Sequence, residues 1–131
     1  MGGKVNVEER HVQATLILEP KKDSPIMTEE IFGCVLPVFP FSTIKEVVDF
    51  INTKDKPLTV YYFGAMKSKN MYYVERNTSS GHFMVNEVLI QFVSSYQGFG
   101  GVGQSGYGRH GGYEGFKCFS NRKGIMMKAA Y

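Results

Sequence analysis

The sequence lacks several features that would place it in a specialised class. It has no run of eighteen apolar residues, so it predicts no membrane span. Its two cysteines, Cys34 and Cys118, are too few for a disulfide framework or a four-cysteine zinc site. Basic residues number 15 and acidic residues 12, which gives a net charge of +3. This excess is small and the charged residues are scattered along the chain, so nucleic-acid binding is not indicated. We expect a reduced, intracellular compartment, the cytoplasm first, with an organelle left open.

Histidine is also scarce, whereas glycine and aromatic residues are abundant. His11, His82 and His110 lie far apart and without the i, i+4 spacing of a helical metal site, so no metal site is predicted. Nine of the fifteen glycines fall from Gly98 to Gly115, and 14% of the residues are aromatic. The length of 131 residues suits one compact domain.

Short apolar runs between turn residues alternate with helical patterns. The runs predict strands over residues 14–18, 34–39, 58–63 and 81–86. Helices are predicted over residues 44–51, 67–77 and 112–119. Residues 1–13 are expected to be a polar lead-in, and residues 87–97 are apolar without a clean period.

The helix over residues 44–51 has the clearest pattern. Its apolar residues recur at i, i+3, i+4 and i+7, on one helix face: Ile44, Val47, Val48 and Ile51. Thr43 stands before this run with Glu46 three residues on, which is the pattern of a capping box.

Alternating strands and helices with short links predict an α/β fold with a partial parallel βαβαβ sheet. Parallel strands need cover on both faces, and three or four strands in so short a chain leave surface uncovered. We therefore expect the fold to be completed by something outside this sequence. The apolar segment 124–128 predicts a strand that pairs outside its own domain.

Two motifs leave alternatives open. Residues 101–106 match G-x-G-x-x-G, but glycines interrupt any helix after them and position 126 is Met rather than an acid. A dinucleotide fingerprint is therefore disfavoured against a loop whose backbone passes close to another segment. Glu29 and Glu30 are either solvated surface groups or carboxylates that accept hydrogen bonds from ligand hydroxyls beside an aromatic ring.

The remaining reactive groups are interpreted as structural. Cys34 and Cys118 are expected to be buried, inert thiols, because nothing nearby in the sequence would lower a thiol pKa. No Ser-His-Asp arrangement is indicated by the spacings. An ordinary solvated surface is expected for the basic residues Lys67, Lys69, Arg109, Arg122 and Lys123.

Four segments taken in order resemble one known family. They are Glu-Glu-Ile-Phe-Gly at 29–33, Asn-Thr-Ser-Ser-Gly at 77–81 followed by Val-Asn at 85–86, Gly-Phe-Gly-Gly-Val-Gly-Gln-Ser-Gly at 98–106, and Phe-Lys-Cys-Phe-Ser-Asn-Arg-Lys at 116–123. This order resembles the aldehyde dehydrogenases, and the Thr-Ser-Ser-Gly and Phe-Ser-x-Arg stretches are similar to the class 3, fatty-aldehyde-type branch. The likeness runs from about residue 3 to residue 128 and corresponds only to the C-terminal portion of that family's chain.

The resemblance implies roles for four residues. Glu30 would hold the hydroxyls of the nicotinamide ribose, and Phe32 would pack beside the nicotinamide ring. Phe99 would line the aldehyde tunnel. Asn86 would brace the active-site loop. No catalytic residue is implied, because the family's cysteine nucleophile, general-base glutamate, oxyanion asparagine and main cofactor turn lie upstream of the matching region.

The resemblance also implies a domain division. Residues 1–115 would be the C-terminal half of a catalytic domain, and residues 116–131 the helix and strand of an oligomerisation arm. The chain departs from the family pattern at two turns, where Cys34 and Gly98 replace proline. Both replacements loosen a turn.

The function expected from the resemblance is the C-terminal part of an enzyme that oxidises an aldehyde to a carboxylate with NAD or NADP. By itself the chain is expected to be inactive. Its partners would be an aldehyde substrate, further copies in a homo- or hetero-oligomer, and a chain that supplies the upstream half. The alternative is a catalytically inactive subunit with a structural or assembly role.

Overall fold

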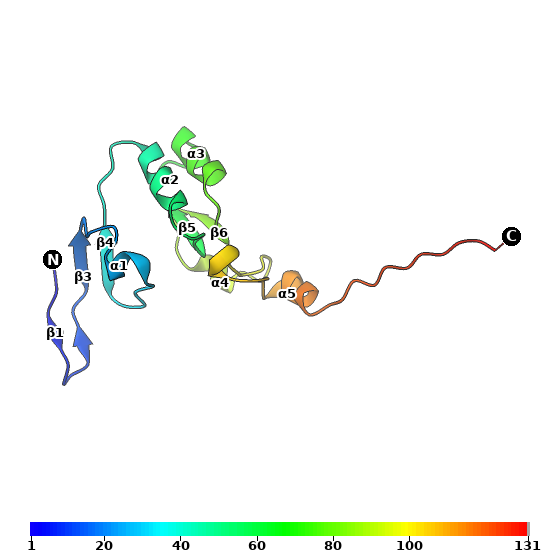
Figure 1. Cartoon of the computed structure of the whole chain (residues 1–131), viewed down its shortest axis with the longest axis horizontal. Coiled ribbons are helices and arrows are strands. Elements are labelled where there is room, and N and C mark those ends of the chain that lie inside the picture. Colours follow the sequence, from blue (N-terminus) through cyan, green and yellow to red (C-terminus); the bar gives the residue numbers. More distant parts are fainter. Residues whose placement is uncertain (131) are drawn as a thin grey trace. The chain divides into compact units, whose positions relative to one another are not determined.

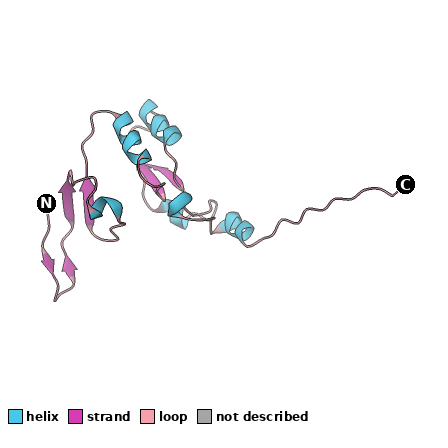
Figure 2. Cartoon of the chain, viewed as in Figure 1, coloured by secondary structure: helices cyan, strands magenta, loops and turns pink. Residues whose placement is uncertain are grey.

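The computed structural model describes residues 1–130, which divide into two compact units, Met1–Ser42 and the chain from Thr43 onward. Each unit contains one pair of short parallel strands, with one short helix in the first unit and the other helices in the second (Figure 2). Among the described residues, no helix is both long enough and apolar enough to cross a membrane.

The first unit consists of two small sheets and one short helix (Figure 1). β1 (Val5–Asn6) pairs antiparallel with β2 (His11–Val12), and β3 (Thr15–Leu18) pairs parallel with β4 (Val35–Val38). The connection between β3 and β4 contains α1 (Pro25–Thr28), which begins at a proline as helices commonly do. Strands β3 and β4 confirm the first two predicted strands.

Residues 1–13 were expected to be a lead-in, and this expectation is wrong because they contain the β1–β2 hairpin. The N–H of Gln13 donates to the carbonyl of Lys4 at 2.9 Å and closes the open end of the hairpin. The N–H of Leu16 on β3 donates to the carbonyl of Met1 at 2.9 Å and joins the segment before the hairpin to the rest of the unit. All four strand residues are exposed. A strand with no buried face has no alternation of polar and apolar residues, so its sequence gives no period-2 pattern.

The second unit contains a β-α-β arrangement preceded by a helix (Figure 1). α2 (Ile44–Asn52) comes first, and β5 (Thr59–Tyr62), α3 (Lys69–Asn77) and β6 (His82–Val85) follow. β5 and β6 pair in parallel from Thr59 opposite His82 to Tyr62 opposite Val85. All four elements confirm the sequence predictions to within about two residues.

A small apolar core holds these elements together. Val48 of α2, Val60 of β5 and Val74 of α3 are the buried apolar residues of the described chain. Partly buried side chains pack around them, including Tyr62 and Phe83. Each buried valine contributes roughly 1.5–3 kcal/mol, so the core is modest for a unit of this length.

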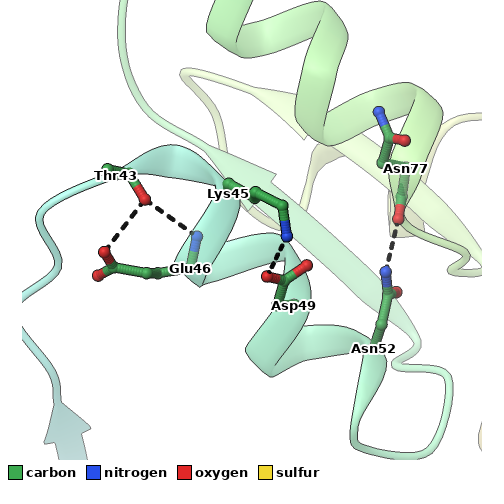
Figure 3. Close-up of polar contacts among 6 residues, drawn as sticks. All are labelled: Thr43, Lys45, Glu46, Asp49, Asn52 and Asn77. Atoms are coloured by element: carbon green, nitrogen blue, oxygen red, sulfur yellow. Dashed lines mark hydrogen bonds and ion pairs between the residues drawn. The ribbon is translucent and has the colours of Figure 1, made fainter.

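Polar contacts organise α2 (Figure 3). The Thr43 hydroxyl accepts from the N–H of Glu46 at 3.3 Å and donates to its carboxylate at 3.1 Å. This confirms the N-cap on which the predicted capping box depends. At the other end of the helix, the Asn52 amide donates to the carbonyl of Asn77 at 2.8 Å and joins the ends of α2 and α3.

The surface of α2 also carries an ion pair (Figure 3). Lys45 Nζ lies 2.6 Å from Asp49 Oδ2, and this hydrogen bond raises the pKa of Lys45 above 10.5. Exposed pairs one helical turn apart contribute little to stability. The pair therefore supports the helix without determining where it begins or ends.

Three short elements complete the second unit. They are α4 (Ile90–Val93), the 3-10 turn η1 (Gly103–Ser105) and α5 (Gly112–Cys118). α5 confirms the predicted short helix. From Ser120 to Ala130 the chain has no helix or strand, so the strand expected at 124–128 is not formed. A strand needs a hydrogen-bonded neighbour, and this segment has none among the described residues.

The predicted α/β class with parallel pairing is confirmed, but the strands pair two by two instead of forming one sheet. Large apolar side chains are exposed in both units, including Leu18, Phe32, Phe63 and Val93. This much exposed apolar surface is unusual for a self-sufficient domain. It fits the expectation that the fold is completed by something outside this sequence.

Candidate functional site

Glu30 and Phe32 lie on the loop that leads from α1 to β4 in the first unit. Both side chains are exposed, Phe32 to 92%. The backbone of Phe32 has φ +42°, in the left-handed region that aromatic residues rarely adopt. The loop therefore displays a carboxylate and an aromatic ring two positions apart. The carboxylate can accept hydrogen bonds from hydroxyl groups, and the ring can pack against a flat ligand.

Asn86 ties together the carboxyl ends of β5 and β6 in the second unit. Its Oδ1 accepts from the N–H of Gly64 at 2.8 Å, and its Nδ2 donates to the carbonyl of Gly64 at 2.9 Å. Its backbone N–H donates to the carbonyl of Tyr62 at 2.8 Å. The backbone of Asn86 has φ +56°, which asparagine tolerates better than most residues. Open α/β sheets bind ligands at this edge, so Asn86 stiffens an edge suited to a site.

Phe99 belongs to an aromatic cluster at the other end of β6. Its ring stacks on the His82 ring with centroids 5.2 Å apart and an interplanar angle of 18°. The rings of Phe92 and His110 meet it edge-on at 5.2 and 5.4 Å. The backbones of Phe99 and His110 exchange two hydrogen bonds, of 2.8 and 2.9 Å. Ring packing and backbone pairing together fix the Phe99 side chain.

Arg109 joins the glycine-rich loop to the start of β6. Its Nη1 donates to the carbonyl of Gly98 at 3.1 Å, and its Nη2 donates to the carbonyl of Gly81 at 3.0 Å. A planar guanidinium can serve two acceptors at once, which a lysine ammonium on its flexible stem does less well. This one side chain therefore connects two segments separated by seventeen positions in the sequence.

His82 is the buried polar residue beneath this connection. It is 8% exposed, and its Nε2 accepts from the N–H of Gly100 at 3.3 Å. Burial lowers the pKa of His82 below 6.5, and the positive charge of Arg109 lowers it further. The imidazole is therefore held neutral, as an acceptor at Nε2 must be.

Gly81 shows why the glycine-rich segment is a loop rather than a dinucleotide fingerprint. A Cβ at position 81 would overlap the carbonyl oxygens of Gly100 and Leu58. After residues 101–106 the chain enters no continuing helix, since η1 ends at Ser105. Of the two interpretations left open, the structure supports a backbone that passes close to another segment.

An open cleft of about 440 Å³ lies beside this loop in the second unit. Phe99 forms part of its wall, together with Arg109, His110 and Cys118. Glycine backbone and the rings of Tyr107 and Phe119 make up most of the remaining lining, so the cleft is suited to a small ligand with an apolar body.

The two thiols differ from expectation. Both Cys34 and Cys118 are free and exposed, so the expectation that they are buried is wrong. Each thiol nevertheless has a backbone partner. Cys34 Sγ donates to the carbonyl of Val12 at 3.1 Å, and Cys118 Sγ donates to the carbonyl of Arg109 at 2.8 Å. Within residues 1–130 no three His, Cys, Asp or Glu side chains lie close enough to hold a metal ion.

The comparison with protein families decides what kind of chain this is. A family profile described as "Aldehyde dehydrogenase family" matches residues 1–125. The chain belongs to the aldehyde dehydrogenase family. The predicted class 3 branch is confirmed as well, since aldehyde dehydrogenase family 3 member F1 of Arabidopsis thaliana is 42% identical over 125 residues, which cover 95% of this chain and 26% of that protein.

Solved aldehyde dehydrogenases share the fold. The substrate-bound state of Staphylococcus aureus AldH superposes with a TM-score of 0.83 at 31% identity, over 99% of this chain and 29% of that one. The P. syringae indole-3-acetaldehyde dehydrogenase AldA, a variant in complex with NAD+ and IAA, has a TM-score of 0.77 at 28% identity, over 89% and 24% of the two chains. The present chain thus spans about a quarter of the length of the curated aldehyde dehydrogenases that it matches.

Two residues that surround Phe99, His82 and Arg109, were not anticipated from the family motifs. His82 was considered only as a metal ligand, and its burial has no signal in a four-residue strand. Arg109 was expected to belong to the solvated surface. The residue is exposed as expected, but the expectation did not include its hydrogen bonds to the carbonyls of Gly98 and Gly81. Glycines leave their backbone carbonyls unshielded, so an arginine among many glycines has several acceptors in reach. This feature of the sequence could have predicted the hydrogen bonds of Arg109.

The departure from the family pattern at Gly98 has a structural reason in this chain. Gly98 is buried, and a Cβ there would overlap Cβ of Glu114 on α5. The position that resembles the family's proline is therefore closed to any side chain here.

Proposed function

We propose that this chain forms part of the ligand-binding walls of an NAD(P)-dependent aldehyde dehydrogenase. The observation that supports this most directly is the cleft walled by Phe99, whose ring is fixed by stacking on His82. An aldehyde with an apolar body would lie against Phe99, and Asn86 would stiffen the sheet edge that leads to the reacting groups.

The residues present fit a nicotinamide cofactor at the first unit's loop. Glu30 offers an exposed carboxylate for ribose hydroxyls, and Phe32 offers an almost fully exposed ring for the flat nicotinamide. When bound, the cofactor supplies the hydride acceptor for aldehyde oxidation. Glu30 and Phe32 then bind and orient, and neither transfers a proton.

The bond-making group is proposed to lie outside this chain. Catalysis by a cysteine needs a thiolate beside a base or another group that lowers its pKa. The Cys34 thiol donates a hydrogen bond to the carbonyl of Val12, and the Cys118 thiol donates one to the carbonyl of Arg109. We therefore expect no aldehyde oxidation by the isolated chain.

A chimera tests this proposal. The matching quarter of the Arabidopsis family 3 member F1 is replaced by this chain, and NADH or NADPH formation is measured with hexanal and with benzaldehyde. The chimera is expected to turn over, the isolated chain is expected to be silent, and Phe99→Ala in the chimera should raise KM for the aldehyde. Activity of the isolated chain would contradict the proposal, as would a folded but inactive chimera.

The alternative is an inactive subunit with an assembly role. The exposed apolar surface favours it, as does the segment after α5, which has no strand partner among the described residues. Under either proposal residues 116–131 act as an oligomerisation arm whose segment 124–128 adds to a neighbour's sheet, and residues 1–115 belong to the catalytic domain. Two exposed free thiols support a reducing, intracellular compartment.

Native mass spectrometry of the purified complex separates the two proposals. Copies bound to a chain that carries the upstream aldehyde dehydrogenase portion would support the enzyme. Copies bound only to each other or to an unrelated assembly would support the structural subunit.

A further inference from the structure

Two independent connections hold the glycine-rich loop against the start of β6. The first is the guanidinium of Arg109, which bonds the carbonyls of Gly98 and Gly81 at 3.1 and 3.0 Å. The second is the His82 ring, which stacks on Phe99 and accepts from the N–H of Gly100. The flanking positions of Phe99 are therefore both held to β6.

The composition of the loop makes such contacts necessary, and the paired backbones of Phe99 and His110 add to them. Five glycines between residues 98 and 106 give it a flexible backbone. Gly106 has φ +154° and Gly103 has φ +63°. Part of the loop therefore adopts a backbone geometry that residues other than glycine rarely adopt. A segment of this composition loses much conformational entropy on ordering, and specific bonds must offset that cost.

We infer that Arg109 and His82 are positioning residues, which act together through Phe99 to set the shape of the cleft. Arg109 restrains the backbone on both sides, since its two acceptors lie in the loop and in the residue before β6. His82 restrains the ring itself and the amide that follows it. Neither residue needs to touch a ligand to affect which ligand fits.

This inference rests on the proposed function for its biological meaning, since Phe99 matters to catalysis only if the cleft receives an aldehyde. The arrangement itself can be tested without any ligand. Failure of the inference and failure of the proposed function are therefore distinguishable: the first appears in the free chain, the second in the chimera.

The test uses NMR on the full 131-residue chain. Two signals report the arrangement: cross-peaks between the Phe99 and His82 rings, and protection of the Gly100 amide from solvent exchange. Arg109→Lys keeps the positive charge and removes the planar guanidinium that serves two carbonyls. This variant is expected to lose most of the Gly100 protection and the ring cross-peaks. Arg122→Lys makes the same change in the segment without helix or strand and should alter neither signal.

Substitutions of His82 separate its two roles. His82→Phe keeps a ring for Phe99 and removes the acceptor, so ring contacts persist while Gly100 loses protection. His82→Gln keeps an acceptor near the place of Nε2 and removes the ring, so Gly100 stays protected while the Phe99 ring is released. Methyl signals of Val48, Val60 and Val74 show whether the core remains folded in each variant.

Two results would overturn the inference. One is an Arg109→Lys chain that matches Arg122→Lys in both signals. The other is a pair of His82 variants that behave identically. If Arg109→Lys instead loses the core valine signals, the His82 pair decides the matter, because the opposite responses expected of it are not produced by general unfolding.

Discussion

At the scale of single residues, three side chains of the candidate site in the second unit form hydrogen bonds to backbone groups. Asn86 bonds the backbone N–H and the carbonyl of Gly64, Arg109 donates to two backbone carbonyls, and His82 accepts from one backbone N–H. Backbone groups are present whatever the side chain, so each of these contacts depends on one side chain alone. Single substitutions should therefore have effects that can be separated.

Replacement of Asn86 tests the first of these contacts. Asn86→Ala removes two hydrogen bonds and places alanine at a left-handed backbone, so we expect the free energy of unfolding to fall by about 1–3 kcal/mol. Asn86→Gly keeps the backbone freedom and removes only the amide, and it should cost less. Urea unfolding followed by circular dichroism measures both variants, and an equal loss for the two would show that φ +56° adds no strain.

Acid should weaken the second unit through His82. The pKa of the folded imidazole lies below 6.5, first because of burial and then because of Arg109. The unfolded chain therefore binds the proton more readily, so the contribution of the neutral ring is complete above pH 6.5 and is lost as the pH falls through the lower folded pKa.

We expect the unfolding midpoint in urea to fall as the pH drops below about 6.5. His82→Gln, which does not titrate, should show a flatter profile over the same range. His11→Gln is the matched control, because His11 lies in the first unit, and its profile should follow the parent chain. Parallel profiles for His82→Gln and the parent would contradict the assignment.

At the scale of elements, α2 is the one whose sequence pattern and structure agree most closely. Its N-cap bond is formed by the Thr43 hydroxyl and the N–H of Glu46. Thr43→Ala should lower the free energy of unfolding by about 1 kcal/mol, within the usual range of 0.5–2 for a lost cap. Thr43→Ser keeps the hydroxyl and should restore most of the difference in a thermal melt, unless the methyl group is what stabilises the helix start.

The sequence predicted elements where one face is buried and missed those where none is. α2, β5, α3 and β6 surround the valine core, so their apolar residues recur with the period of their secondary structure. The β1–β2 hairpin has no buried residue and gave no pattern. α4 is only four residues long and starts after Leu89 at φ +64°, too short for a helical period to appear.

The candidate site was predictable only as far as the family motifs reach. Glu30, Phe32, Asn86 and Phe99 came from the resemblance. The structure places the first two on an exposed loop and the others at opposite ends of β6. Their proposed roles stay predictions. The bonds of Arg109 arise from a close approach of segments distant in sequence, which a local pattern does not encode.

At the scale of the whole molecule, each unit contains its own strand pair. All residues of the Phe99 arrangement lie after Thr43. A chain that begins at Thr43 should therefore retain the ring cross-peaks between His82 and Phe99 and a similar urea midpoint for their loss. Loss of those cross-peaks on removal of residues 1–42 would show that the first unit is needed to order the loop.

Exposed apolar surface has a further consequence at this scale. The free chain should bind a hydrophobic dye such as ANS, because large apolar side chains are exposed in both units. In the active chimera that surface should be covered, so dye fluorescence per chain should fall several-fold. Equal fluorescence would mean that the upstream portion does not pack on this chain.

The two ends of the β5–β6 pair differ in chemistry. At the carboxyl end the Asn86 amide bonds Gly64, and this amide has no proton to gain or lose near neutrality. At the amino end the His82 imidazole, which can gain a proton, bonds Gly100 of the glycine-rich loop. Mild acid should therefore release the glycine-rich loop from the amino end of the strand pair, while the Asn86 contact at the carboxyl end persists. Such an opening has a direction: a drop in pH would uncover the aromatic wall and leave the carboxyl edge of the strand pair in register.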